Sequence, residues 1–160
     1  MKIGITGHQN LGDQSTKKWV RMVLGEAVSK YRITQGFTCL AVGADQLYAE
    51  ILKQRNIPYT AVIPSKNYER TFVDKSLYEN FLLLLTHASN TVNLYFDEPS
   101  ETAFFEAGKE VVNMSTVMFA VWNGKEAKGL GGTGDIVKYS LDSGKKVVHF
   151  NPLLRTVTEV

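Results

Sequence analysis

Short apolar runs alternate with helix-like stretches along this chain of 160 residues, and the alternation restricts the fold more than any other feature. The apolar runs are predicted to be strands, and the stretches between them have the three- and four-residue spacing of helices with one buried face. The predicted strands cover residues 2–6, 37–42, 58–63, 91–96, 117–122 and 145–150, and the predicted helices cover residues 15–31, 46–54, a long stretch ending near 87, 101–113 and 133–143. Every connection is long enough to cross over a sheet. The chain is therefore predicted to be α/β, a single-domain doubly wound, mainly parallel sheet of about six strands and five helices.

Length and composition agree with one folded domain over residues 1–160, because a chain of this size can bury one ordinary core. The content of 44% hydrophobic and 21% charged residues is typical of a globular protein. No segment approaches the roughly 20 apolar residues of a membrane helix, so the chain is expected in the cytoplasm without a membrane partner. The net charge of +2 comes without a basic block, so nucleic acid is not favoured as a partner. The lone Cys39 is expected to fill the core.

A glycine-rich loop follows the fifth predicted strand and precedes the last predicted helix. It carries Gly129, Gly131, Gly132, Thr133 and Gly134. Bare backbone of this kind brings several N–H groups close to one anion, and the start of a helix adds its positive end to the same place. The loop alone fits a phosphate site and a loop without a ligand equally well.

Further polar or glycine-rich segments follow the other predicted strands. Since the carboxyl ends of parallel strands lie at one edge of a sheet, these segments are expected to share a ligand crevice there. This convergence favours a phosphate-bearing ligand. The candidate ligand-binding residues are Gly7, His8, Asn10, Gly43, Asp45, Ser65, Lys66, Trp122, Asn123, Gly129, Gly131, Gly132 and Thr133.

Some of these residues also have ordinary structural roles. Asp45 is well placed to cap the second helix, and this role is favoured over catalysis. His8 fits a phosphate contact, an acid–base role or simple exposure to solvent. Trp122 and Tyr68 have flat rings suited to stacking on a base. His87 and His149 are expected to be structural.

One carboxylate is a candidate for catalysis. Glu106 lies among apolar neighbours near the start of the fourth predicted helix, where a desolvated carboxylate would stabilise a developing sugar cation or activate water. A surface glutamate on an amphipathic helix is the favoured explanation of Glu106.

No cofactor beyond a nucleotide-type ligand is predicted. No His, Cys, Asp or Glu cluster has metal-ligand spacing. Gly4, Gly7 and Gly12 do not fit the dinucleotide pattern, and no P-loop is present, so neither NAD binding nor ATP hydrolysis of the P-loop kind is expected.

The third predicted helix carries the apolar run Phe81–Leu85, which is longer than one buried face requires. Burial within the monomer and a subunit interface explain the run equally well. The chain is therefore a possible homo-oligomer.

An ordered set of motifs at the strand ends resembles the SLOG superfamily, a Rossmann-like group that includes the cytokinin-activating phosphoribohydrolases, DNA-processing protein A and the YpsA-like proteins. The motifs lie at residues 4–8, 42–45 and 115–123, and in Gly131-Gly132-Thr133 with the apolar helix after it. The chain looks most similar to the YpsA-like and DNA-processing branches. The resemblance implies a nucleotide or nucleotide-derived ligand with its phosphate at Gly131, Gly132 and Thr133. The phosphoribohydrolases pair an Arg on the preceding helix with a Glu just after this motif. In this chain the preceding helix offers Lys109 and no Arg, and the acid position falls at Asp135 or at Ile136.

Three functional hypotheses follow. The first is a sensor or regulatory protein that binds a nucleotide or nucleotide-derived phosphate ligand. The second is a nucleoside 5'-monophosphate N-glycosidase that releases free base, with Glu106 or Asp135 as the acid. The third is single-stranded nucleic-acid binding by analogy with the DNA-processing branch, against which the modest net charge argues.

Overall fold

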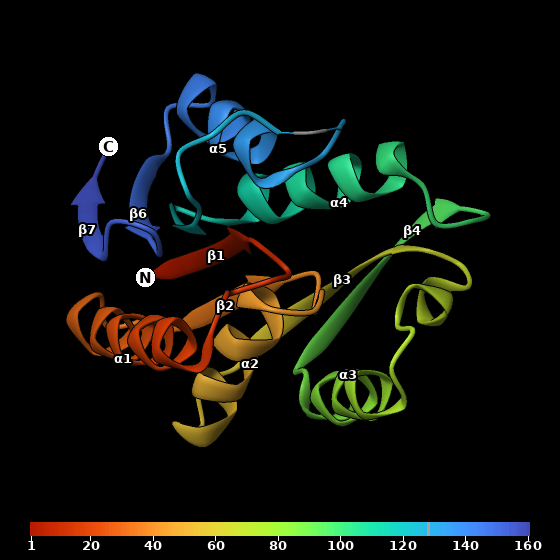
Figure 1. The fold of residues 1–160 in the computed structure, drawn as a ribbon. Helices are drawn as coiled ribbons and strands as arrows, with labels where there is room; N and C mark the ends of the chain where they lie inside the picture. The colour runs from red at the N-terminus through yellow and green to blue at the C-terminus, as the bar shows by residue number, and fades with distance from the viewer. Residues whose placement is uncertain (128) are drawn as a thin grey trace.

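The computed structural model describes residues 1–127 and 129–160, and Figure 1 shows them as a sheet with helices on both faces. The strands are β1 (Lys2–Gly7), β2 (Gln35–Thr38), β3 (Tyr59–Ser65), β4 (Asn90–Phe96), β5 (Val117–Val121), β6 (Lys146–Asn151) and β7 (Thr156–Glu159). The helices are α1 (Gln14–Lys30), α2 (Ala44–Gln54), α3 (Lys75–His87), α4 (Glu101–Met114) and α5 (Thr133–Asp142), with a 3-10 turn η1 (Tyr68–Thr71).

The strand order is β4-β3-β2-β1-β5-β6-β7. Neighbouring strands are parallel except for β6 and β7, which are antiparallel. The chain first builds the sheet outward from β1 to β4, and then returns to the other side of β1 with β5. The strand order therefore reverses between β1 and β5. This arrangement confirms the predicted doubly wound, mainly parallel sheet.

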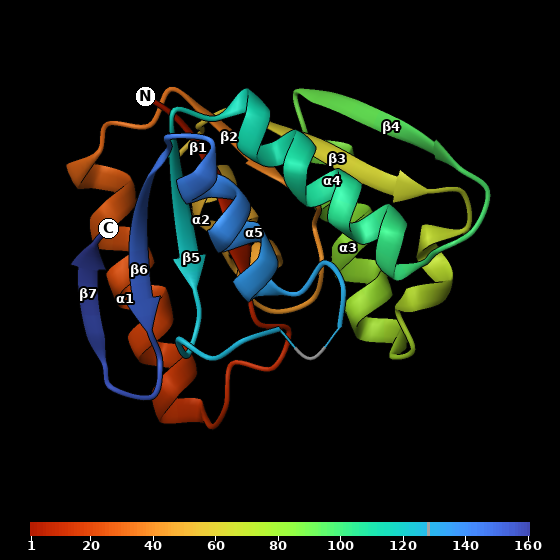
Figure 2. The ribbon, with the colours of Figure 1, turned by 90° about the horizontal axis from the view of Figure 1, so that it is seen from above.

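Two hydrophobic clusters cover the two faces of the sheet. Residues of α1, α2 and α3 form the first cluster with one face of the strands, and residues of α4 and α5 form the second with the other face. Figures 1 and 2 show this separation of the helices. All five residues of β5 are buried, because this strand lies inside the sheet and is covered on both sides. Cys39 packs against the second cluster, in agreement with its expected place in the core.

The caps explain where several helices begin. Ser100 accepts a hydrogen bond from Ala103 N at 3.1 Å and so caps α4. Asp13 caps α1 in the same way through Thr16 N.

The last predicted strand covers residues 145–150, and the structure has one more strand after Pro152. Residues Thr156–Glu159 form β7, an antiparallel edge strand on β6. All four residues are exposed, so the strand lacks the buried apolar run by which the other strands were predicted.

The strand predicted over residues 37–42 ends earlier than expected, at Thr38. Leu40 has a φ of +56° and Gly43 has a φ of +90°, so the chain leaves the extended conformation directly after β2. The apolar run of α3 is divided: Phe81 and Leu84 are buried, whereas Leu82 and Leu83 are about 41% and 47% exposed.

Within the described residues, no helix is both long and apolar enough to cross a membrane.

Candidate ligand site

The loops after β1 and β5 meet at the carboxyl edge of the sheet, where the strand order reverses. His8 N donates to Val121 O at 3.0 Å, and Asn123 N donates to Nε2 of His8 at the same distance. Figure 2 shows the arrowhead of β5 and the loop after β1 on the same side of the molecule. The predicted neighbours His8 and Asn123 are therefore in direct contact at the place where open α/β sheets carry their ligand crevice.

The loop after β2 joins this edge by a close backbone approach. Ala44 N donates to His8 O at 3.1 Å. A Cβ at Gly43 would lie 2.4 Å from the carbonyl oxygens of His8 and Gln9, and one at Gly7 would lie 2.5 Å from the Cβ of Ala44. Gly7 and Gly43 are thus required for packing between the two loops, whatever else they contact.

The hydrogen bond from Asn123 N defines the charge state of His8. A ring nitrogen that accepts an N–H bond must be unprotonated. Burial lowers the pKa of His8, and a bond with the Asn123 side chain opposes this effect less strongly. His8 is therefore a neutral, structurally engaged residue of the site near neutral pH, with its Nδ1 as the remaining ring nitrogen.

Asp45 does not cap α2 as predicted. The residue that precedes the helix is Gly43, and Asp45 lies within the first turn with its side chain buried. Its Oδ2 accepts from Thr38 Oγ1 at 3.0 Å and from Cys39 N at 2.9 Å. The carboxylate therefore turns back toward the loop after β2 and holds it. Burial raises the pKa of Asp45 to about 6, against the opposing effect of these hydrogen bonds.

Two residues that support this loop were missing from the sequence analysis. Thr38 Oγ1 also accepts from Leu40 N at 3.0 Å, and Gln46 Nε2 donates to Leu40 O at 3.2 Å. Both side chains are buried polar groups that satisfy the backbone of the left-handed Leu40. The only local signal in the sequence was that Thr38 is a polar residue at the end of an apolar strand.

The glycine loop packs closely on the first turn of α4. A Cβ at Gly129 would lie 2.6 Å from Oε1 of Glu101, and one at Gly131 would lie 2.9 Å from the backbone N of Phe105. A Cβ at Gly132 would lie 2.8 Å from the Cβ of Ala127. Close packing therefore accounts for these glycines without a ligand, which is one of the two explanations that the sequence left open.

The start of α5 still offers backbone donors. Gly132 precedes the helix without a side-chain cap. Asp135 Oδ2 accepts from Gly131 N at 3.0 Å, and Gly132 N donates to Gly129 O at 3.4 Å. Within the described residues, the N–H groups of Thr133 and Gly134 have no hydrogen-bond partner. These two amides are the ones left for an anion at the positive end of the helix.

Trp122 lies beside this helix start. Its Cζ2 is 3.5 Å from the position of a Cβ on Gly134, and its Nε1 donates to Lys125 O at 2.7 Å. The ring of His149 lies 5.2 Å away between centroids, and a ring nitrogen of His149 contacts Trp122 O at 2.7 Å. His149 thus has the structural role that was predicted, and it fixes the backbone of Trp122.

Three residues predicted around the loop after β3 do not join the site. Tyr68 is buried among the rings of Phe72, Phe81 and Phe104, and its hydroxyl donates to Cys39 O at 3.0 Å, so it offers no face for stacking. Lys66 is exposed and pairs with Asp97 at 3.4 Å. Ser65 is buried, and its Oγ has no hydrogen-bond partner within the described residues. β2 lies between β1 and β3, so the loop after β3 is not next to the loop after β1. The sequence does not reveal this strand order.

Asn10 also has a local role. Its Oδ1 accepts from Gly12 N at 2.9 Å, which stabilises the turn before α1.

Glu106 is not the desolvated acid that its apolar neighbours suggested. Its Oε1 pairs with Nζ of Lys109 at 2.7 Å, and its side chain is 41% exposed. Lys109 in turn lies over the rings of Phe105 and Tyr139, which places the pair where α4 meets α5. Helical periodicity explains the error: Ala103 and Ala107 face the sheet, and Glu106 falls beside that stripe.

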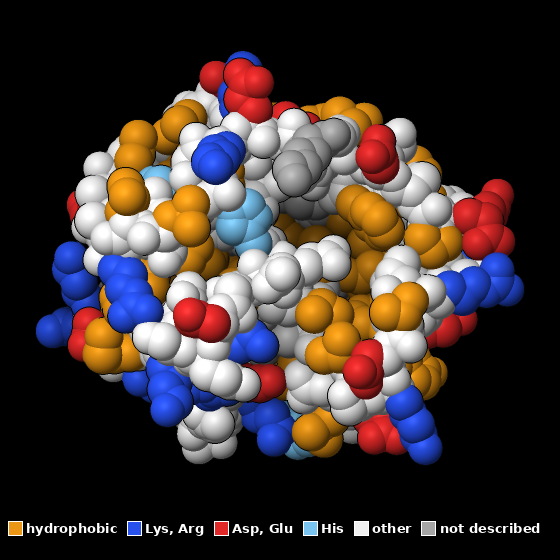
Figure 3. All heavy atoms as spheres, in the orientation of Figure 1, with side chains coloured by type: hydrophobic (Ala, Val, Ile, Leu, Met, Phe, Trp, Pro, Cys, Tyr) orange, Lys and Arg blue, Asp and Glu red, His pale blue; other side chains and the backbone are white. Residues whose placement is uncertain are grey.

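Figure 3 views this edge of the molecule in the orientation of Figure 1 and shows a hollow near the centre, with hydrophobic side chains in its floor and a histidine beside it. Lys and Arg side chains gather over α1 rather than around the hollow. Across residues 1–127 and 129–160 there is no group of three or more His, Cys, Asp or Glu side chains arranged to hold a metal ion.

Comparison with known proteins gives likeness in structure only. The chain matches no protein-family model and no curated protein sequence. DNA processing protein A from Streptococcus pneumoniae superposes with a TM-score of 0.65 at 16% identity over 92% of this chain and 49% of that chain. The Helicobacter pylori DNA processing protein A gives a TM-score of 0.66 at 14% identity over 93% of this chain and 64% of that chain. A molybdenum cofactor binding protein from Rippkaea orientalis gives 0.57 at 18% identity over 92% and 74%.

The chain thus spans about half to two thirds of the length of the DNA processing proteins. The Helicobacter pylori protein has a single-stranded DNA binding mode. At these identities the likeness concerns the fold: the chain has the Rossmann-like fold of DNA processing protein A, a member of the SLOG superfamily that its strand-end motifs resemble.

Proposed function

We propose that this protein binds a nucleotide or nucleotide-derived phosphate ligand at the carboxyl edge of β1 and β5. The observation that carries the proposal is the meeting of the loops after β1, β2 and β5 where the strand order reverses, through His8, Gly43 and Asn123. Ligands of open α/β sheets bind at such a point.

The phosphate is assigned to the start of α5. Thr133 and Gly134 present amides without partners in the described part of the chain, and the helix adds its positive end. Gly131 N already donates to Asp135 Oδ2, so the N–H groups of Thr133 and Gly134 are the ones assigned to the phosphate. Trp122 beside Gly134 is the ring placed to contact the rest of the ligand.

Binding is favoured over hydrolysis because both candidate acids are engaged. Glu106 is paired with Lys109, and Asp135 holds the glycine loop. A sensor or regulatory protein only has to bind its ligand, so it does not need either carboxylate to be free for catalysis. The N-glycosidase hypothesis remains as an outcome of the same experiment.

Thr133→Asp tests the phosphate site. An Asp in the first turn of a helix is favourable for the helix but repels a phosphate bound there. We expect affinity for nucleoside mono-, di- and triphosphates to fall at least about tenfold, which is about 1.4 kcal/mol. Thr133→Asn is the matched neutral control. Gly132 is less suitable for this test, because any side chain there would meet Ala127.

Thermal shift and calorimetry against a panel of nucleotides, sugar phosphates and free bases give the measurement. A saturating ligand at about 100 times its dissociation constant adds about 2.7 kcal/mol of stability. Equal affinity in Thr133→Asp and Thr133→Asn would remove the phosphate from the start of α5. Release of free base from a bound nucleotide would instead establish the hydrolase.

Single-stranded DNA is the second candidate, because the Helicobacter pylori neighbour binds it. Anisotropy titrations with a fluorescent oligo(dT) at several salt concentrations test it directly. Binding through phosphates weakens steeply with salt. Competition of that binding by the nucleotide that shifts the melting temperature would place both ligands in one site.

A further inference from the structure

We propose that a cavity between α5 and β6 holds the planar base of the ligand, which makes the ligand a nucleotide rather than a sugar phosphate. The inference rests on the function proposed above, in which the phosphate lies at the start of α5. The cavity has a volume of about 270 Å³ and lies between α5 and the neighbouring strand β6. Figure 2 shows α5 beside β5 and β6, and the helix contacts both strands.

The cavity begins at the phosphate site. Gly134 and Trp122 line it, and both belong to the candidate ligand site at the start of α5. The other residues that α5 contributes lie on one face of the helix, at Val137, Lys138, Leu141 and Asp142. The rise of an α-helix places Leu141 about 10 Å beyond Gly134 along the axis. A ligand held by its phosphate at the helix start therefore has a continuous cavity beside it in which its base can lie.

Two aromatic rings form the wall of the cavity beside Gly134. The ring centroids of Trp122 and His149 are 5.2 Å apart, and the rings are tilted by 41°. Trp122 Nε1 donates to Lys125 O at 2.7 Å, and a ring nitrogen of His149 donates to Trp122 O at 2.7 Å. Because both rings are already held by the backbone, a base that packs against them costs little further ordering of side chains. Stacking on such rings is a common way to bind a base.

The rest of the cavity is mainly apolar and large enough for a base. Val137 and Val147 are buried and form its inner side, whereas Leu141 and Val160 are exposed and form its open side. A dry cavity of about 150 Å³ already accepts a benzene ring. The volume of about 270 Å³ therefore accommodates a base of two fused rings.

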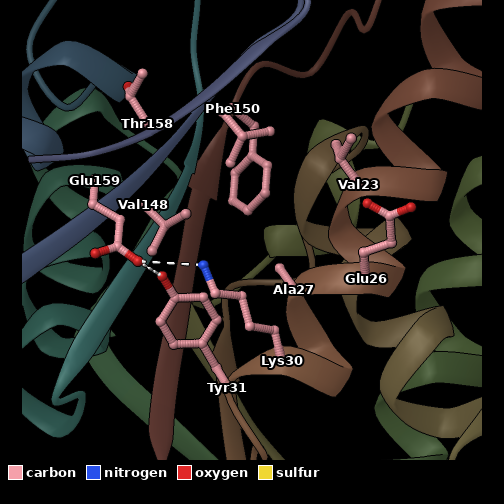
Figure 4. A pocket seen from close by; sticks show the side chains of 10 residues that line it. Val23, Glu26, Ala27, Lys30, Tyr31, Val148, Phe150, Thr158 and Glu159 are labelled. Atoms are coloured by element: carbon pink, nitrogen blue, oxygen red, sulfur yellow. Dashed lines mark hydrogen bonds and ion pairs between the residues drawn. The ribbon is translucent and has the colours of Figure 1, made fainter.

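A second cavity, on the α1 side of the sheet, is lined differently. It has a volume of about 250 Å³, and Lys30, Tyr31 and Glu159 are among the residues that line it. Figure 4 shows Glu159 paired with Lys30 and bonded to the hydroxyl of Tyr31, so charged and polar groups converge there. In the α5 cavity the charged Lys138 and Asp142 pair with each other at 2.6 Å and are largely exposed. Of these two cavities, the one at α5 thus combines apolar walls with an adjacent site for an anion.

Calorimetry of the purified full chain with nucleoside 5'-monophosphates and with ribose 5-phosphate tests the inference. Both kinds of probe present the same phosphate, but only the nucleotides can place a base in the cavity. We expect the nucleotides to bind at least about tenfold more tightly than ribose 5-phosphate, because a base stacked on an aromatic ring contributes this much. Purine nucleotides should bind more tightly than pyrimidine nucleotides, since two fused rings bury more apolar surface.

Leu141→Trp and Val160→Trp each fill the cavity from its exposed side. Each should weaken nucleotide binding at least about tenfold more than ribose 5-phosphate binding. Met22→Trp is the matched control, because Met22 is an exposed apolar residue of α1 on the opposite face of the sheet, and it should leave both affinities unchanged. In Trp19→Phe, Trp122 is the only tryptophan, and its fluorescence should be quenched by nucleotides but not by ribose 5-phosphate.

The outcomes distinguish this inference from the function on which it rests. If neither nucleotides nor ribose 5-phosphate bind to wild type, the phosphate site and the base site are both overturned. If nucleotides bind and Thr133→Asp weakens them, but both cavity-filling variants bind them as wild type does, the base lies outside the cavity and only this inference is overturned. Equal affinities of wild type for nucleotides and for ribose 5-phosphate would also overturn this inference alone.

Discussion

At the scale of single residues, the side chains that shape the site are mainly those that satisfy backbone groups. Asp45 accepts from Thr38 and Cys39, and His8 accepts from Asn123 N. Both titratable groups are at least partly buried, and burial is the largest cause of each pKa shift. Their effects on stability have opposite pH dependence, because burial disfavours the charged form of each.

Asp45 should make the protein more stable in mild acid. Its folded pKa of about 6 lies above the ordinary 3.8, so the folded protein binds the proton more tightly than the unfolded chain. The contribution is full below about pH 4 and is lost as the pH rises through 6. Relative to Asp45→Asn, wild type should gain up to about 3 kcal/mol between pH 7 and pH 4.

Urea unfolding of both proteins across this pH range is the measurement. His8 is present in both, so its opposite dependence, which lowers stability as the pH falls below the ordinary value of 6.5, cancels in the difference. Parallel pH profiles for wild type and Asp45→Asn would show that the carboxyl group is not held in its buried position.

At the scale of elements, the site depends on loops that pack against each other and on helix starts. The loop after β2 lies against the loop after β1 at Gly43, and the glycine loop lies against α4 at Gly131. The helix starts at α4 and α5 differ, since Ser100 caps the first and no side chain caps the second. The uncapped start is the one with donors to spare for a ligand.

Gly43→Ala should destabilise the protein by more than the usual cost of a left-handed alanine. Gly43 has a φ of +90°, and a Cβ would meet two carbonyl oxygens at 2.4 Å. We expect a loss of about 3 kcal/mol in unfolding free energy. Gly144→Ala is the matched control, because Gly144 has a φ of +70° but no atom within 4 Å of the added Cβ. That variant should lose only about 1 kcal/mol in chemical denaturation. Equal losses would show that the two loops can separate.

At the scale of the whole molecule, stability should fall from the centre of the sheet to its edges. β5 is fully buried and paired on both sides, whereas β4 and β7 are edge strands with exposed residues. The amides of β5 should therefore exchange only through global unfolding. The inward-facing amide of Thr158 should exchange on the order of a hundredfold faster than those of β5.

Hydrogen exchange followed by mass spectrometry or NMR measures this gradient. Uniform protection across all strands would mean that the sheet opens only as one unit.

Local periodicity determined a large part of the fold. The alternation of apolar runs and amphipathic stretches placed six strands and five helices close to their observed positions. The carboxyl ends of parallel strands lie at one edge of a sheet, and this rule correctly predicted that His8 and Asn123 lie close together. These features depend on neighbours in sequence, or on a rule that every parallel sheet obeys.

Only the tertiary structure decided the rest, because the rest depends on contacts between residues far apart in the chain. Strand order removed Ser65 and Lys66 from the site, and burial among aromatic rings removed Tyr68. The exposed residues of β7 carry no pattern of their own and become a strand by pairing with β6. In the sequence, the glycines of the ligand loop suggest bare backbone for a phosphate. In the structure they are explained in part by helix α4, which lies against them. No local sequence pattern reports the distance between two elements.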